Sequence, residues 1–185
     1  MVQLQRRAES LGSSRKYTVH QTWMPLSRIS PELQHAVIAA EDGRFYEHRG
    51  IDWKQVEIVV EEAKESGEVA RGASTLTQQL VKNLYFTTHR NPLRKVAEWV
   101  MAPVAEVLLG KQRELELYLN VVEWGDGVYG AEAAAQLHYG VSAARLSRDQ
   151  AARLAAILPS PRRRKPARMN DYSAIIQQRM RQMGW

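Results

Sequence analysis

The chain has 185 residues, which is enough for one domain with a sizeable buried core, and it contains no cysteine. The lack of cysteine excludes disulfides, thiolate catalysis and cysteine-ligated zinc. Its 26 Lys and Arg residues outnumber its 20 Asp and Glu residues, giving a formal net charge of +6. A basic balance favours an anionic partner, such as nucleic acid, anionic lipid or a phosphorylated substrate.

Helical periodicity runs through most of the chain. Residues 1–22 are polar and irregular, and we expect them to form a poorly ordered lead-in to a single domain at residues 23–185. The longest apolar stretch, residues 99–110, is shorter than the ~20 residues that a membrane-spanning helix needs. No segment shows a convincing strand-like alternation, so the sequence predicts an all-α fold. A short hairpin within residues 65–90 would escape this pattern.

The first expected helix begins at Pro31, with Ser30 as its N-cap, and ends before Gly43. Glu41 falls in its last turn, where the negative end of the helix dipole raises the pKa of a carboxyl toward the range useful for proton transfer. Asp42 projects about 100° away around the helix, so only one of the two carboxylates can point squarely into a given cleft. A solvated acidic helix end is the alternative interpretation.

Two more helices are expected before residue 90. The expected inward face of the helix at residues 53–64 consists of Val56, Val59, Val60 and Ala63. The next helix begins near Thr75, and its polar stripe consists of Thr75, Gln78, Gln79 and Lys82. Free backbone N–H groups at a helix start with a nearby lysine can bind an anion, although an ordinary N-capped surface helix would have the same pattern.

A long helix is expected to begin at Pro92, with Asn91 as its N-cap, to kink at Pro103 and to stop at Gly110. Its apolar residues are Val96, Val100, Val104, Val107 and Leu108. Arg94 and Glu98 are four residues apart, and the plainest interpretation is a surface ion pair worth ~0.3 to 0.5 kcal/mol. A further helix is expected at residues 111–122.

The C-terminal third contains three expected helices and a basic run. The first covers residues 131–136, the second is capped by Ser147 and Gln150, and Asp171 is expected to cap the last. The run PRRRKPAR precedes the last helix and would attract anionic lipid if it is not simply a solvated loop. No reading helix or aromatic platform accompanies it, so nucleic-acid binding is not expected.

Five ordered segments resemble the motifs of the lysozyme-like peptidoglycan glycosyltransferases. They are EDGRFYEHRG (41–50), RGASTLTQQLVKN (71–83), RKVAE (94–98), KQRELELYLN (111–120) and GVYGAEAAA (127–135). Their order and spacing fit over about residues 23–183, and the first two motifs are highly specific. Transpeptidase motifs are absent from the sequence, so the chain is most similar to the monofunctional biosynthetic transglycosylases of this family.

The resemblance implies a large lysozyme-like lobe, a smaller membrane-facing jaw and a cleft between them. Its implied substrates are lipid II and the growing lipid-linked glycan strand, joined by β-1,4 bonds with inversion and release of polyprenyl pyrophosphate. Glu41 would be the catalytic base, and Glu98 the second essential carboxylate. The implied substrate-binding residues are Asp42, Arg71, Ser74, Thr75, Gln79, Lys82, Arg90, Arg94 and Lys95.

The same resemblance implies work at the periplasmic face of the bacterial cytoplasmic membrane. The expected partner is the membrane surface, and contacts with other cell-wall synthesis proteins stay open. The N-terminal spanning anchor that the family implies is absent from this sequence. No cofactor is required by the pattern, which leaves open a divalent cation, Mg²⁺ or Mn²⁺.

Two other functions compete with this one. A lysozyme-like enzyme that cleaves peptidoglycan also uses a helix-end glutamate, but it does not expel pyrophosphate. The clustered cations Lys82, Arg90, Arg94 and Lys95 argue against it. Outside enzymes, the alternative is a non-catalytic scaffold at a membrane surface.

Overall fold

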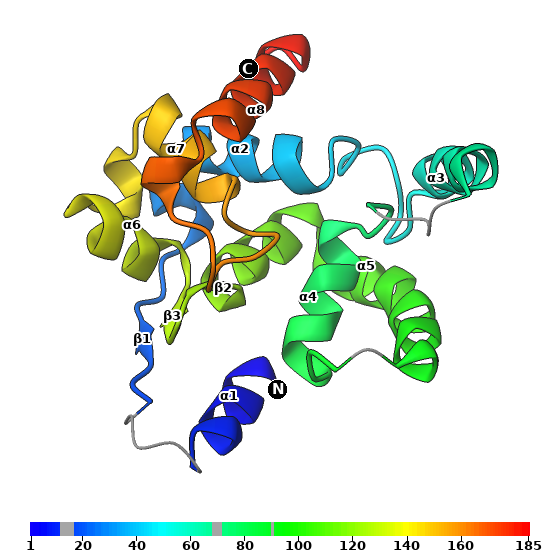
Figure 1. Cartoon of the computed structure of the whole chain (residues 1–185), viewed down its shortest axis with the longest axis horizontal. Coiled ribbons are helices and arrows are strands. Elements are labelled where there is room, and N and C mark those ends of the chain that lie inside the picture. Colours follow the sequence, from blue (N-terminus) through cyan, green and yellow to red (C-terminus); the bar gives the residue numbers. More distant parts are fainter. Residues whose placement is uncertain (12–16, 68–71, 90) are drawn as a thin grey trace.

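The computed structural model describes residues 1–11, 17–67, 72–89 and 91–185, and this part of the chain is mainly helical (Figure 1). Its α-helices are α1 (Val2–Ser10), α2 (Pro31–Glu41), α3 (Trp53–Ser66), α4 (Leu76–Tyr85), α5 (Pro92–Val121), α6 (Ala131–Tyr139), α7 (Arg148–Ala155) and α8 (Asn170–Gln182). Short 3-10 helices cover Leu26–Arg28, Ala143–Arg145 and Pro166–Arg168. The predicted all-α class is confirmed, with one small sheet added.

That sheet is formed by β1 (His20–Gln21), β2 (Glu123–Gly125) and β3 (Val128–Tyr129) in the order β1-β3-β2. The strands β2 and β3 are antiparallel neighbours on either side of a glycine-containing turn, and β1 adds to β3 in parallel. Two or three residues are too few to show the alternation by which strands are detected in a sequence.

The prediction that residues 1–22 would be irregular is wrong for much of that segment. Residues 2–10 form α1, which lies beside α4, and β1 belongs to the sheet. The buried side chain of Val2 and an ion pair between Arg6 and Glu123, at 3.4 Å, tie α1 to the rest of the domain. This order depends on tertiary contacts, which local polarity does not reveal.

The larger lobe packs α2 against α7 and α8, with α6 and the C-terminal half of α5 completing its core (Figure 1). Small residues, among them Ala151, Ala152 and Ala155 of α7, are fully buried and allow the helices to approach closely. The expected capping box of Ser147 and Gln150 is present at the start of α7. The expected cap by Asp171 is wrong, because α8 begins at Asn170 without a side-chain cap.

The smaller lobe consists of α3, α4 and the N-terminal half of α5 (Figure 1). In α3 only Val59 of the expected inward face is buried, and Val60 is exposed. The expected stop at Gly110 is confirmed, because its φ of 72° and ψ of 159° break the helical path of α5. Ahead of that break, six apolar side chains are more than half exposed: Leu93, Val96, Val100, Val104, Val107 and Leu108.

None of the helices in the described part of the chain is long and apolar enough to cross a membrane.

Candidate active site

A cavity of about 510 Å³ lies where the C-terminal end of α2 meets the segment before α4 and the last turns of α8. Its lining includes Glu41, Asp42, Ser74, Thr75, Arg179 and Met183. The first two motifs of the sequence, which are separated along the chain by α3, therefore meet at one cavity.

Glu41 is the last residue of α2, as predicted from the helix signals. Its Oε2 accepts a hydrogen bond of 2.8 Å from Nε2 of Gln79. Burial raises the pKa of the Glu41 carboxyl above its ordinary value, while the Gln79 bond and the charges of Lys82 and Arg164 oppose this rise. The pKa of Glu41 is raised, as the sequence predicted. The main cause of the rise is burial, whereas the prediction relied on the helix dipole.

Gln79 belongs to a longer chain of hydrogen bonds. The hydroxyl of Tyr118, from the C-terminal half of α5, donates to Oε1 of Gln79 at 3.0 Å. Tyr118 is only 1% exposed. Three elements thus contribute to the surroundings of Glu41: α2 supplies the carboxyl, α4 the amide and α5 the phenol.

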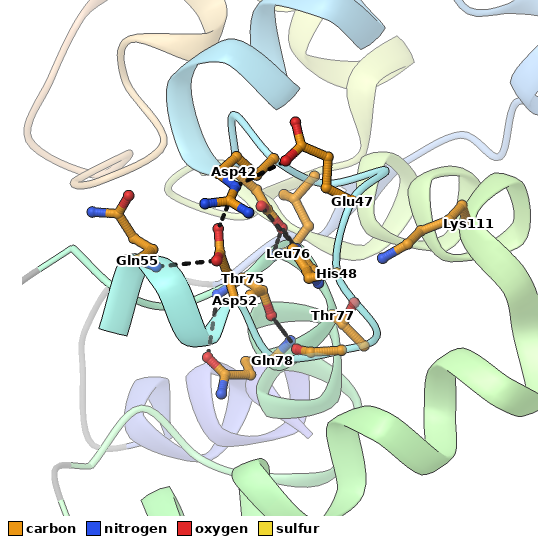
Figure 2. Close-up of polar contacts among 12 residues, drawn as sticks. Asp42, Glu47, His48, Asp52, Gln55, Thr75, Leu76, Thr77, Gln78 and Lys111 are labelled. Carbon is orange, nitrogen blue, oxygen red and sulfur yellow. Dashed lines mark hydrogen bonds and ion pairs between the residues drawn. The ribbon is translucent and has the colours of Figure 1, made fainter. Parts of the chain in front are cut away.

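Asp42 connects α2 to the start of α4 (Figure 2). Its Oδ2 accepts a hydrogen bond of 2.8 Å from the backbone N–H of Leu76, the first residue of α4. Both of its oxygens lie 3.0 Å from Nε2 of His48, which must donate to a carboxylate. The side chain is buried, so the structure gives Asp42 a positioning task, and its direct contact with substrate stays a prediction.

The hydroxyl of Thr75 also makes its hydrogen bonds within the protein (Figure 2). Its hydroxyl donates to the carbonyl of Gly50 at 2.6 Å and accepts the N–H of Gln78 at 3.2 Å. Gln78 in turn accepts the N–H of Thr75, which completes a capping box at the start of α4. Thr75 therefore holds α4 and the first-motif loop together.

A second polar cluster surrounds Glu98, which is 2% exposed. Arg94 donates a hydrogen bond to Oε1 of Glu98, and Nζ of Lys95 lies 3.6 Å from Oε2. Lys95 also donates to the hydroxyl of Ser74 at 2.9 Å. The exposed ion pair that was the plainest interpretation of Arg94 and Glu98 is wrong, because the carboxylate is buried.

Lys82 is a largely buried cation on α4. Burial lowers the pKa of its ammonium, whereas the carboxylates of Glu98 and Glu41 act in the opposite direction. No hydrogen-bond or ion-pair partner is present for it in the residues that the structure describes. The predicted binding residues Arg71 and Arg90 lie outside those residues.

The residues near Glu98 do not fit a divalent cation held by protein ligands. Mg²⁺ and Mn²⁺ prefer several oxygen ligands, whereas both oxygens of Glu98 face Arg94 and Lys95. In residues 1–11, 17–67, 72–89 and 91–185, no three His, Asp or Glu side chains are grouped so that they could hold a metal ion.

Two cations near the site, Arg164 and Arg179, were not among the predicted site residues. Arg164 opposes the rise in the pKa of Glu41 and donates to the carbonyl of Ala156 at 2.9 Å. Arg179 of α8 lines the cavity and donates to the carbonyl of Ala39 at 3.4 Å. The basic run PRRRKPAR contains Arg164, but only the folded arrangement shows that this arginine lies close enough to Glu41 to oppose the rise in its pKa.

A family model described as Transglycosylase matches residues 7–183. The chain belongs to the transglycosylase family. It is similar to the biosynthetic peptidoglycan transglycosylase of Chromohalobacter salexigens, with 47% identity over all of this chain and 80% of that relative. The proteins of the same name from Laribacter hongkongensis and Ectopseudomonas mendocina are 44% and 45% identical to it. These matches cover 85% and 98% of this chain and 71% and 76% of those relatives.

Proposed function

We propose that this member of the transglycosylase family is a peptidoglycan glycosyltransferase that polymerises lipid II into β-1,4-linked glycan strands. The observation that carries the proposal is a largely buried helix-end carboxyl, Glu41, near the ammonium of Lys82, which in turn lies near Arg94 and Lys95. A base next to several cations suits a reaction that removes a proton and expels an anionic group.

In this reaction Glu41 accepts the proton of the sugar 4-hydroxyl of the acceptor. The oxygen then attacks the anomeric carbon of the lipid-linked donor, and the bond between that carbon and the pyrophosphate breaks. Attack from the opposite face inverts the α-configuration to a β-1,4 bond. The proton rests on Glu41, and the leaving group is polyprenyl pyrophosphate. Burial supports this assignment because it raises the affinity of the carboxylate for a proton.

Lys82 is the residue best suited to the leaving group. A buried ammonium without a partner is costly, and a pyrophosphate oxygen would lower that cost while its own developing charge is stabilised. Arg94 and Lys95 would extend the same positive surface, with Glu98 holding both cations in place. Such preorganised donors stabilise a transition state because they need no rearrangement during the reaction.

The exposed apolar side chains of α5 support work at a membrane surface. Leu93, Val96, Val100, Val104 and Val107 recur every three or four residues, so they form one stripe along the helix. An apolar stripe of this kind can enter the headgroup region of a bilayer, where a polyprenyl-linked substrate would also lie. The outer face of the bacterial cytoplasmic membrane is the place at which we expect this enzyme to act.

The test is polymerisation of labelled lipid II in liposomes by the wild type and by Glu41→Gln, with products resolved before and after muramidase digestion. We expect muramidase-sensitive glycan from the wild type and at least 10²-fold slower turnover by a folded Glu41→Gln. Near-normal polymerisation by that variant would remove Glu41 as the base. Digestion of purified cell wall without polymerisation of lipid II would instead favour the peptidoglycan-cleaving alternative.

A further inference from the structure

The hydrogen bonds around Gln79 run in one direction, from a buried phenol to the carboxyl of Glu41. Tyr118 donates to Oε1 of Gln79 at 3.0 Å, and Nε2 of Gln79 donates to Oε2 of Glu41 at 2.8 Å. Neither outer partner belongs to the same element as Gln79, since Glu41 ends α2 and Tyr118 lies in α5. The amide is therefore oriented by contacts at both of its ends.

Reversing the amide of Gln79 would replace the hydrogen-bond donor opposite the Glu41 carboxyl with an acceptor. The carbonyl oxygen Oε1 would then face the carboxyl, and two acceptors can approach each other only if Glu41 carries a proton. The nitrogen Nε2 would face Tyr118, whose hydroxyl could accept a hydrogen bond but would lose the acceptor for its own proton. Because Tyr118 is 1% exposed, water would not readily replace that acceptor.

On the basis of the proposed function, we infer that Tyr118 is a positioning residue of the active site, which orients the amide of Gln79 so that its N–H₂ group faces Glu41. Tyr118 does not contact the substrate in this role. It keeps the catalytic carboxyl in front of a donor, so that Glu41 enters each cycle as a proton acceptor. Gln79 transmits the effect between them.

Other charged and titratable groups near Glu41 act alongside this chain of hydrogen bonds. They are Asp42 of α2, Lys82 of α4, Arg164 from the loop after α7 and Arg179 of α8. Tyr118→Phe changes none of these groups and removes one oxygen atom. The change in the titration of Glu41 can therefore be assigned to the amide of Gln79.

The decisive experiment combines a pH profile of kcat with a titration of the Glu41 carboxyl followed by NMR of ¹³C-labelled glutamate. The Glu41 signal is assigned by its loss in Glu41→Gln. In Tyr118→Phe the reversed amide becomes accessible and favours protonated Glu41, so its pKa should rise. We expect the acidic limb of the profile to move up by about one pH unit. The rate should fall about tenfold on the acidic side, with KM and the alkaline plateau changed by less than about twofold.

Tyr129→Phe is the matched control. Tyr129 is also fully buried, and its hydroxyl is hydrogen-bonded to that of Tyr17 at 2.8 Å. This variant should keep the wild-type profile, so an equal shift in both variants would overturn the inference. An unchanged Glu41 titration in a folded Tyr118→Phe would overturn it as well.

Gln79→Met provides the second variant, because it removes the amide through which Tyr118 acts. It should raise the pKa of Glu41 by itself, and adding Tyr118→Phe should then cause no further shift. If Tyr118→Phe does not fold, an unchanged titration in Gln79→Met refutes the inference. The NMR titration needs no substrate, so a protein that fails to polymerise lipid II would count against the proposed function while the titration still decides the role of Tyr118.

Discussion

Glu114 offers a direct test of how burial governs the carboxyls of this fold. It lies in the C-terminal half of α5 and is 1% exposed. Its Oε2 accepts the hydroxyl of Thr77 at 3.0 Å, while its Oε1 has no hydrogen-bond partner within the described residues. Burial, opposed by the Thr77 bond and by nearby Lys111 and His48, raises the pKa of Glu114 from 4.5 to about 7.

The effect of Glu114 on the free energy of unfolding follows from the difference between its pKa in the folded chain and its pKa in the unfolded chain. At about 1.4 kcal/mol per pH unit, ionised Glu114 lowers the free energy of unfolding by about 3 kcal/mol. Because the folded state binds the proton more tightly, this contribution is absent below about pH 4.5. Stability is lost as the pH rises toward about 7, and the full penalty is present above that value.

The perturbation is Glu114→Gln, which keeps the size of the side chain and an acceptor for Thr77 but cannot ionise. We expect it to raise the free energy of unfolding by about 3 kcal/mol at about pH 8, and to change it by less than about 1 kcal/mol at about pH 4.5. The assay is urea unfolding followed by circular dichroism at both pH values. Glu57→Gln, on the exposed face of α3, is the control. A stability difference that is equal at both pH values would refute the reasoning.

Two further predictions concern the cleft and the smaller lobe. Lys82→Met should lower kcat at least tenfold, because the leaving group loses a cation, and Lys82→Arg should retain more activity. Thermal stability should not fall in Lys82→Met, because the charge that is removed is largely buried and has no partner in the described residues. Equal kcat for the wild type and Lys82→Met in a lipid II assay would move the donor site elsewhere. Val100→Glu combined with Val107→Glu should reduce co-sedimentation with anionic vesicles at least tenfold. The urea midpoint should stay unchanged, because both side chains are more than half exposed. Unchanged co-sedimentation would show that this stripe is not the membrane contact.

Local signals in the sequence located much of the framework. Pro31 and Gly43 bracket α2 and thereby place Glu41 at its end. The helix start expected near Thr75 and the capping pair of Ser147 with Gln150 mark where α4 and α7 begin. These signals succeed because each involves residues only a few positions apart, so that their effect on the backbone does not depend on the rest of the fold. The cap expected at Asp171 failed, because α8 begins one residue earlier, at Asn170, without a side-chain cap.

By itself the sequence therefore determined the order of the helices, the position of Glu41 at a helix end and the family. Tertiary structure decided how Glu41 is buried, which partners hold Asp42 and Gln79, and which face of α5 meets solvent. Asp42 and Leu76 are 34 residues apart, and Gln79 and Tyr118 are 39 apart. Such contacts form only when several helices pack at once, and burial depends on everything that surrounds a side chain. The periodicity of a single helix shows that it has an apolar face, but it does not show whether protein or solvent will cover that face.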